Sequence, residues 1–207
     1  MPRLLAPVLD STQALHSELL PLWDGLVPAS NRAMVTTGFC FIVRQHSLAQ
    51  LQLLALGLDV SATALVRPCY ESLVRAIWTM RAAEQEWIDG FLTPKADAVE
   101  GDAETRKGPP VDSMLAAIGR AEPSQVHGPL VELKDKTWRA MHSYVHGGIR
   151  PFSQVLNDTP EHEAAGVAVN ANVMLFMATE VVRMTNGQRS AGLPAIWCKY
   201  ASVSLPP

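Results

Sequence analysis

The most informative side chains of this sequence are an arginine and two histidines, Arg139, His142 and His146, spaced by three and four residues. On a helix this spacing places all three side chains on one face, because residues three and four positions apart are neighbours there. Gly147 and Gly148 follow directly, and glycine is the residue that most often ends a helix. The spacing therefore predicts a guanidinium and two imidazoles along the last two turns of one helix.

Three interpretations of this row are open. The histidines can simply end the helix, where an imidazole interacts favourably with the helix dipole and with the last carbonyl groups. His142 and His146 can instead chelate one metal ion, but such a site needs a third ligand, and the sequence has no HExxH or paired Cys/His signature. The candidates for that ligand are Glu71, Glu161, His162 and Glu163. Without a signature, we expect no bound metal and no cofactor.

In the third interpretation, Arg139 and His146 form a ribonuclease-like pair. A histidine can act as general acid or base on a ribose hydroxyl or on a leaving oxygen. An arginine can stabilise the negative charge that develops on a phosphate. We therefore take His146 and Arg139 as the candidate catalytic residues.

A second polar row lies earlier in the chain, at Arg67, Glu71 and Arg75, each four residues apart. One interpretation is a solvated ladder of ion pairs that adds little stability. The other is a polar seam facing a cleft, whose guanidinium groups hold a phosphate or a carboxylate at two points. Pro68 lacks an amide hydrogen and should bend this helix or mark its first turn. Trp138 lies near the other row and could wall a pocket or stack a base, although packing alone is its simplest role. We expect the two rows to meet across one cleft.

The two rows also carry a resemblance to a known superfamily. The spacing from Arg139 to His146 falls within the Arg-x4–6-His signature of the HEPN superfamily, whose members are all-helical bacterial domains, many of them RNA-cleaving toxins or phage-defence effectors. The chain further resembles a set of HEPN-like bacterial proteins in which one helix contains Arg-Pro-x-x-Glu-x-x-x-Arg-x-x-Trp and a later helix ends in Tyr-Val-His-Gly-Gly. The corresponding segments here are Arg67-Pro68-Cys69-Tyr70-Glu71-Ser72-Leu73-Val74-Arg75-Ala76-Ile77-Trp78 and Tyr144-Val145-His146-Gly147-Gly148.

The resemblance implies an effector or defence protein that binds, and in the stronger form of the hypothesis cleaves, RNA or a nucleotide without a metal ion. It also implies a homodimer, because an HEPN active site commonly lies between two protomers. Ala140 follows Arg139, where the ribonuclease motif commonly has a polar residue. The alternatives are a non-catalytic helical module that binds a small anion or a protein partner, and a metal-dependent hydrolase. The residues expected to contact the substrate are Arg67, Glu71, Arg75, His142, Tyr144 and Arg150.

Helical signals dominate the chain, and no run alternates apolar and polar residues as a half-buried strand would. The segments with a helical pattern are 9–26, 31–56, 62–83, 84–92, 111–121, 129–145, 161–184 and 194–203. Ser30 is the expected N-cap of the second helix. Segment 94–110, rich in charged residues, Gly and Pro, is predicted to be a mobile surface loop, and 147–160 is predicted to be irregular. The pattern predicts one all-α domain over residues 1–207, a helical bundle of HEPN-like character.

The composition fits such a domain, because 48 % hydrophobic and 18 % charged residues in a chain of 207 allow one well-filled core. A net charge of −3 argues against broad binding to nucleic acid but not against a local basic cleft. Three cysteines without CxxC spacing favour a reducing cytoplasm. Pro7 and Asp10 interrupt the apolar N-terminus, so no signal peptide is predicted. The uncharged run 164–179 is short for a bilayer, so we expect a buried helix and no membrane association.

Overall fold

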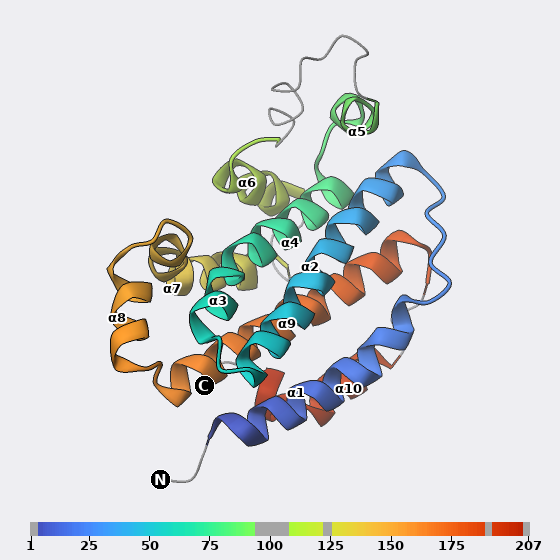
Figure 1. Cartoon of the computed structure of the whole chain (residues 1–207). Helices are drawn as coiled ribbons and strands as arrows, with labels where there is room; N and C mark the ends of the chain where they lie inside the picture. The colour runs from blue at the N-terminus through green and yellow to red at the C-terminus, as the bar shows by residue number, and fades with distance from the viewer. Residues whose placement is uncertain (1–3, 94–107, 122–125, 189–191, 205–207) are drawn as a thin grey trace.

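The computed structural model describes residues 4–93, 108–121, 126–188 and 192–204, which form helices joined by short connections (Figure 1). These ranges contain no strand, so the all-α prediction is confirmed for them. Of the predicted loop 94–110, residues 94–107 lie outside the described residues. The helices are α1 (Leu5–Leu19), the 3-10 helix η1 (Leu20–Trp23), α2 (Asn31–Ala55), α3 (Asp59–Ala64), α4 (Val66–Arg81), α5 (Gln85–Leu92), α6 (Val111–Ala121), α7 (His127–Val145), α8 (Ile149–Asn157), α9 (Glu161–Thr185), α10 (Leu193–Lys199) and α11 (Ala201–Ser204).

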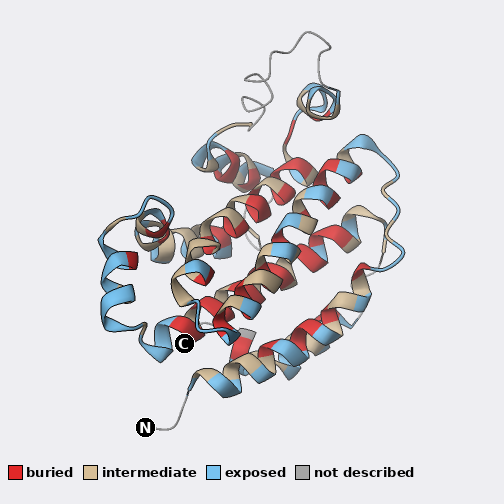
Figure 2. Cartoon of the chain, viewed as in Figure 1, coloured by how far each residue is buried: buried red, intermediate tan, exposed pale blue. Residues whose placement is uncertain are grey.

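Three long helices, α2, α4 and α9, form the centre of the bundle and pack against one another. Burial is nearly complete on the inner face of α4, at Leu73, Val74 and Ile77. Figure 2 shows buried residues along these helices and exposed residues on the outer helices and connections. Among the described residues, α9 is the one helix long and apolar enough to cross a membrane by length and composition, and most of its apolar window is buried in the bundle. The prediction of a buried helix at 164–179 is confirmed.

Pro68 decides where α4 begins. A proline has no amide hydrogen, and its ring clashes with the carbonyl four positions earlier, so it is tolerated only in the first turn of a helix. Helix α4 begins at Val66, with Pro68 as its third residue, and α3 ends at Ala64. The single helix predicted over 62–83 is therefore wrong, whereas the first-turn role of Pro68 is confirmed. Ser30 is confirmed as a cap, because its hydroxyl accepts a hydrogen bond from an amide in the first turn of α2.

A glycine turn ends α7, and α8 begins directly after it. Gly147 has a φ of +63°, and the amide of Gly148 donates to the carbonyl of Ser143 at 2.7 Å. Together these form the usual glycine-based closure of a helix C-terminus. Helix α8 follows and packs beside α3 and α7 at one end of the bundle. The prediction of an irregular segment over 147–160 is therefore wrong.

Candidate functional site

The two polar rows meet where α4 lies beside α7. The Nε atom of Arg67 donates a hydrogen bond to Oε1 of Glu71 at 2.8 Å, and its Nη1 atom lies 3.0 Å from Nδ1 of His142. The same guanidinium covers the ring of Trp138, with its central carbon 4.6 Å from the ring centroid. About a quarter of the Arg67 and Glu71 side chains is exposed (21 % and 28 %), so the pair faces an opening rather than the core. Arg67 therefore joins both rows at one place.

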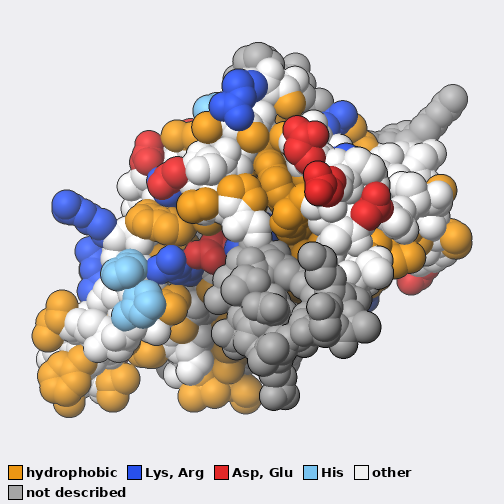
Figure 3. Space-filling view, turned by 90° about the horizontal axis from the view of Figure 1, so that it is seen from above, with side chains coloured by type: hydrophobic (Ala, Val, Ile, Leu, Met, Phe, Trp, Pro, Cys, Tyr) orange, Lys and Arg blue, Asp and Glu red, His pale blue; other side chains and the backbone are white. Residues whose placement is uncertain are grey.

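The two histidines of α7 lie side by side at this place. Their ring centroids are 4.4 Å apart with an interplanar angle of 52°, and both residues are exposed. An arginine can only donate hydrogen bonds, so Nδ1 of His142 is the acceptor in its contact with Arg67, and the ring proton of neutral His142 sits on Nε2. In Figure 3 a pair of histidine side chains lies beside a basic and an acidic side chain on the surface. An incoming anion would therefore meet an N–H of His142 and an open imidazole at His146.

A surface pocket of about 420 Å³ opens beside these contacts. It brings together residues from α3, α4 and the end of α7, including members of both polar rows. Its lining is Ala64, Arg67, Pro68, Glu71, Tyr144, Val145 and His146. Of the sequence-predicted site residues, the structure thus places Arg67, Glu71, Tyr144 and His146 around one pocket, with His142 bonded to its rim.

Tyr144 also lines a second cavity, of about 290 Å³, between α7 and α9. The predicted residue Arg150 lies here together with Glu163, and Val66 and Val167 contribute apolar surface. Burial raises the pKa of the Tyr144 hydroxyl, the carboxylate of Glu163 raises it further, and the charge of Arg150 opposes the shift. The hydroxyl of Tyr144 is therefore a neutral hydrogen-bonding group in a cavity that also holds a carboxylate and a guanidinium.

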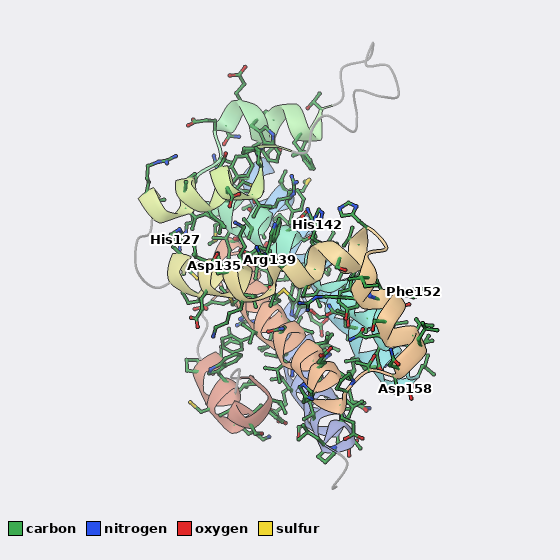
Figure 4. The ribbon with its side chains drawn as sticks, turned by 90° about the vertical axis from the view of Figure 1, so that its left-hand side faces the viewer. His127, Asp135, Arg139, His142, Phe152 and Asp158 are labelled. Carbon is green, nitrogen blue, oxygen red and sulfur yellow. The ribbon has the colours of Figure 1, made fainter. Side chains whose placement is uncertain are left out.

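Two predicted arginines lie apart from the histidines. Arg139 is exposed on α7, seven residues before His146, and does not line the pocket that contains His146. Within the described part of the chain, its side chain forms no hydrogen bond or ion pair. Figure 4 shows Arg139 and His142 along the same helix. Arg75 is half-buried one turn after Glu71; its burial lowers its pKa, and the charge of Glu71 opposes that shift. The guanidinium that reaches the histidines is the one of Arg67.

No group of three His, Cys, Asp or Glu side chains in the described ranges has the arrangement of a metal site. His142 and His146 therefore lack a third ligand among Glu71, Glu161, His162 and Glu163. The buried thiol of Cys69 is also unsuited to nucleophilic chemistry, because burial raises its pKa to about 12.

Trp138 has a larger role than the sequence indicated. Besides supporting Arg67, its ring packs edge-on against Tyr70, with centroids 6.4 Å apart, and Lys134 approaches it at 5.3 Å. Trp138 lies one turn before His142, a spacing that places it near the polar row, but its contact with Arg67 of another helix could not be read from that spacing. Its ring lies against the Arg67 guanidinium and supports that group beside the pocket.

Comparison with known proteins gives one match. A family model covers residues 40–202, from within α2 to within α11, and so includes both polar rows, the pocket and α8. No curated protein and no solved structure matches the chain. Since the match spans well over half of the 207 residues, the chain belongs to DUF6988, a family of unknown function.

Proposed function

We propose that this protein is an HEPN-like cytoplasmic effector or defence protein that binds RNA or a nucleotide in the pocket of Arg67 and His146. We further propose that it cleaves RNA there by acid/base chemistry without a metal ion. The observation that carries the proposal is the contact of Arg67 with His142, next to the exposed ring of His146. A guanidinium beside two imidazoles supplies both phosphate binding and proton transfer.

Arg67 is the phosphate-binding group of this proposal. A guanidinium has five N–H donors, and Glu71 and His142 each take one from Arg67. Three donors are left for the oxygens of a phosphate in the pocket. Glu71 orients the guanidinium from one edge, and Trp138 supports its face. The planar group can therefore bind two phosphate oxygens at once.

His146 is the proton-transfer group. It takes the proton of a ribose 2′-hydroxyl, whose oxygen then attacks the adjacent phosphorus to form a cyclic phosphate. The bond from phosphorus to the 5′ oxygen of the next nucleotide breaks, and His146 returns the proton to that oxygen. The Nε2–H of His142 and the donors of Arg67 stabilise the charge on the phosphate during the reaction. The step needs no oxidant, reductant or metal ion.

The remaining candidate residues bind outside the reacting centre. Arg139 is on the same face of α7 as His146 and about 10 Å along the axis, seven residues at 1.5 Å each. In this proposal it contacts the phosphate of a neighbouring nucleotide rather than the one that reacts. Tyr144 walls the pocket, Arg150 adds positive charge in the adjoining cavity, and Arg75 adds positive charge near Glu71.

The separation of Arg139 from His146 favours a second candidate, a non-catalytic module that binds a small anion or a protein partner. In this case the pocket holds a phosphate or a carboxylate, but no group completes the catalytic pair. Ala140, after Arg139, offers no polar side chain to compensate. Binding and cleavage must therefore be measured separately.

The experiment measures binding and cleavage of a fluorescein-labelled single-stranded RNA by the wild type and four variants. His146→Ala should lower the cleavage rate by about a hundredfold or more, the scale of general acid–base catalysis, with binding retained. Arg67→Lys should weaken both RNA binding and cleavage, because lysine lacks the planar guanidinium that binds two oxygens at once. The matched controls, His162→Ala and Arg120→Lys, change exposed residues outside the pocket and should behave as the wild type.

Each other result has a defined meaning. RNA binding that Arg67→Lys weakens, without cleavage by any variant, would support the binding module. Cleavage abolished by a chelator would establish a metal-dependent hydrolase instead. Equal cleavage by wild type and His146→Ala, or no binding of RNA or nucleotide at all, would refute the proposal.

A further inference from the structure

Two opposite charges line the cavity of about 290 Å³ beside Tyr144 without pairing with each other. The cavity lies where α8 leads from the end of α7 to the start of α9 (Figure 1). Arg150 lines it from α8, and Glu163 lines it from the first turn of α9. Within the described residues no ion pair joins these two side chains. Their hydrogen-bonding groups are therefore left for a third partner in the cavity.

Hydrogen bonds of α8 support both charged groups. Nε2 of Gln154 donates to Oε2 of Glu163 at 2.7 Å. A carboxylate has about four lone-pair sites on its two oxygens, so Oε1 and one site of Oε2 can still accept from a ligand. The backbone amide of Arg150 donates to Oγ of Ser143 at 3.3 Å, which joins the first turn of α8 to α7. The carboxylate and the guanidinium are thus supported by the fold and still able to bind.

The rest of the lining suits a flat ring. Val66, Met141 and Val167 contribute buried apolar surface from α4, α7 and α9. Gly166 leaves open space, because a Cβ at this position would meet nothing within 4 Å. Asn170, on the same face of α9, adds a side-chain amide that can both donate and accept. Apolar walls with a few polar groups are typical of small-molecule sites, and this volume is at the lower end of their range.

We propose that this cavity binds the guanine base of the nucleotide whose phosphate lies at Arg67 and His146. Guanine has two adjacent donors, N1–H and the N2 amine, and two neighbouring acceptors, O6 and N7. The carboxylate of Glu163 accepts from the two donors. The guanidinium of Arg150 donates to O6 and N7, the usual two-point contact of an arginine with guanine. The inference rests on the proposed function, which supplies the phosphate site.

The cavity and the phosphate pocket adjoin each other, so one nucleotide can occupy both. Tyr144 lines both of them, and the consecutive residues Val66 and Arg67 line the cavity and the pocket respectively. In a nucleotide the ribose joins the base to the phosphate. The base in the cavity then belongs to the nucleotide whose 2′-hydroxyl gives its proton to His146, on the 5′ side of the bond that breaks.

Guanine fits these groups better than other ligands that carry both donors and acceptors. Adenine and cytosine present one amine beside an acceptor, and uracil presents one N–H between two carbonyls, so a carboxylate finds a single donor position on each. A free amino acid carries its ammonium and carboxylate on one carbon atom. It would therefore need Arg150 and Glu163 side by side, where the two would form an ion pair with each other. Guanine presents its donors and its acceptors on neighbouring edges, which matches two charged groups that are held apart.

The test is isothermal titration of the full chain with the 3′-monophosphates of guanosine, inosine, adenosine and cytidine. Guanosine 3′-monophosphate should bind about tenfold more tightly than the adenosine and cytidine compounds, the scale of one two-point base contact. The inosine compound, which lacks the N2 amine, should bind more weakly than the guanosine compound. Glu163→Gln should remove the preference for guanine and retain binding through the phosphate. The control Glu180→Gln changes an exposed carboxylate of the same helix outside the cavity and should keep the preference.

The outcomes separate the base site from the phosphate site. Arg67→Lys should weaken the binding of all four nucleotides alike, because Arg67 contacts the phosphate that they share. Equal affinity for the four nucleotides would overturn the guanine site and leave the nucleotide binding of the proposed function intact. So would a preference for another base, or a guanine preference that Glu163→Gln leaves unchanged. No binding of any of the four would refute the phosphate site and, with it, the guanine site.

Discussion

The Nη1 atom of Arg67 on α4 lies 3.0 Å from the Nδ1 atom of His142 on α7, although the two residues are 75 positions apart in the chain. This contact joins the two polar rows, and it sets the tautomer of neutral His142. It also identifies Arg67 as the arginine that contacts the histidine row. The proposed site is therefore a feature of helix packing rather than of one sequence segment.

Replacement of Arg67 by alanine should lower the free energy of unfolding by about 1 kcal/mol. The change removes a partly exposed ion pair, worth up to about 1 kcal/mol, and a contact over Trp138 worth a similar amount. Urea unfolding followed by circular dichroism measures the difference. Arg120→Ala, an exposed change on α6, should stay within about 0.5 kcal/mol of the wild type. Equal effects of the two variants would show that Arg67 has no structural role.

Apolar periodicity predicted the helices that bury a row of apolar residues in the core. The segment 111–121 coincides with α6, and 161–184 differs from α9 by one residue at its C-terminus. It failed at 147–160, where the spacing of Ile149, Phe152 and Leu156 is helical but the segment lies between turn residues and does not face the core. When the apolar face of a short helix does not pack against the core of its own domain, a single sequence does not distinguish that helix from an irregular connection.

The candidate site was predictable in part. The two polar rows follow from helical spacing. The choice between Arg67 and Arg139 as partner of the histidines does not, because it depends on how α4 and α7 cross. The role of Trp138 depends on the same crossing, since its ring supports a guanidinium from the other helix.

Gly166→Ala should stabilise the protein by about 1 kcal/mol. A glycine inside a helix costs conformational entropy relative to alanine, and a Cβ at Gly166 would meet nothing within 4 Å. The added methyl group would narrow the cavity beside Tyr144, which Gly166 lines. Gly119→Ala is the matched control, because there a Cβ would approach the ring of His127 to 3.1 Å. The melting temperature should rise for Gly166→Ala, and it should rise less or fall for Gly119→Ala. The reverse order would contradict the argument.

Asp158→Gly should stabilise the fold. Glycine relieves the backbone conformation at φ 61°, which should raise the free energy of unfolding by about 1 kcal/mol. Chemical unfolding of the wild type and of the variant measures the difference. A loss of stability would show that the aspartate side chain compensates the strain of its backbone.

A buried histidine lies far from the proposed site, at the contact of α1 with α9. Nε2 of His16 donates to Oδ1 of Asn172 at 3.1 Å, and the amide nitrogen of Asn172 donates to Thr12 at 2.9 Å and to the carbonyl of Val203 at 2.8 Å. The Asn172 oxygen must therefore accept from His16, which leaves Nδ1 of the ring as the atom that would be protonated. No described group accepts a hydrogen bond from that atom. A proton there would place an unpaired charge in the core.

Stability should consequently fall as the pH is lowered. Burial lowers the pKa of His16 from 6.5 to about 4 in the folded state, so between these values the unfolded chain binds a proton that the folded chain does not. Unfolding is thereby favoured by up to about 3 kcal/mol at the acidic end. Urea unfolding across this range should show a shallower pH dependence for His16→Gln, which retains a donor to Asn172. Some slope should remain, because burial also lowers the pKa of His46. The control His162→Gln changes an exposed histidine and should keep the wild-type slope; the same slope in His16→Gln would mean that His16 is not the group that titrates.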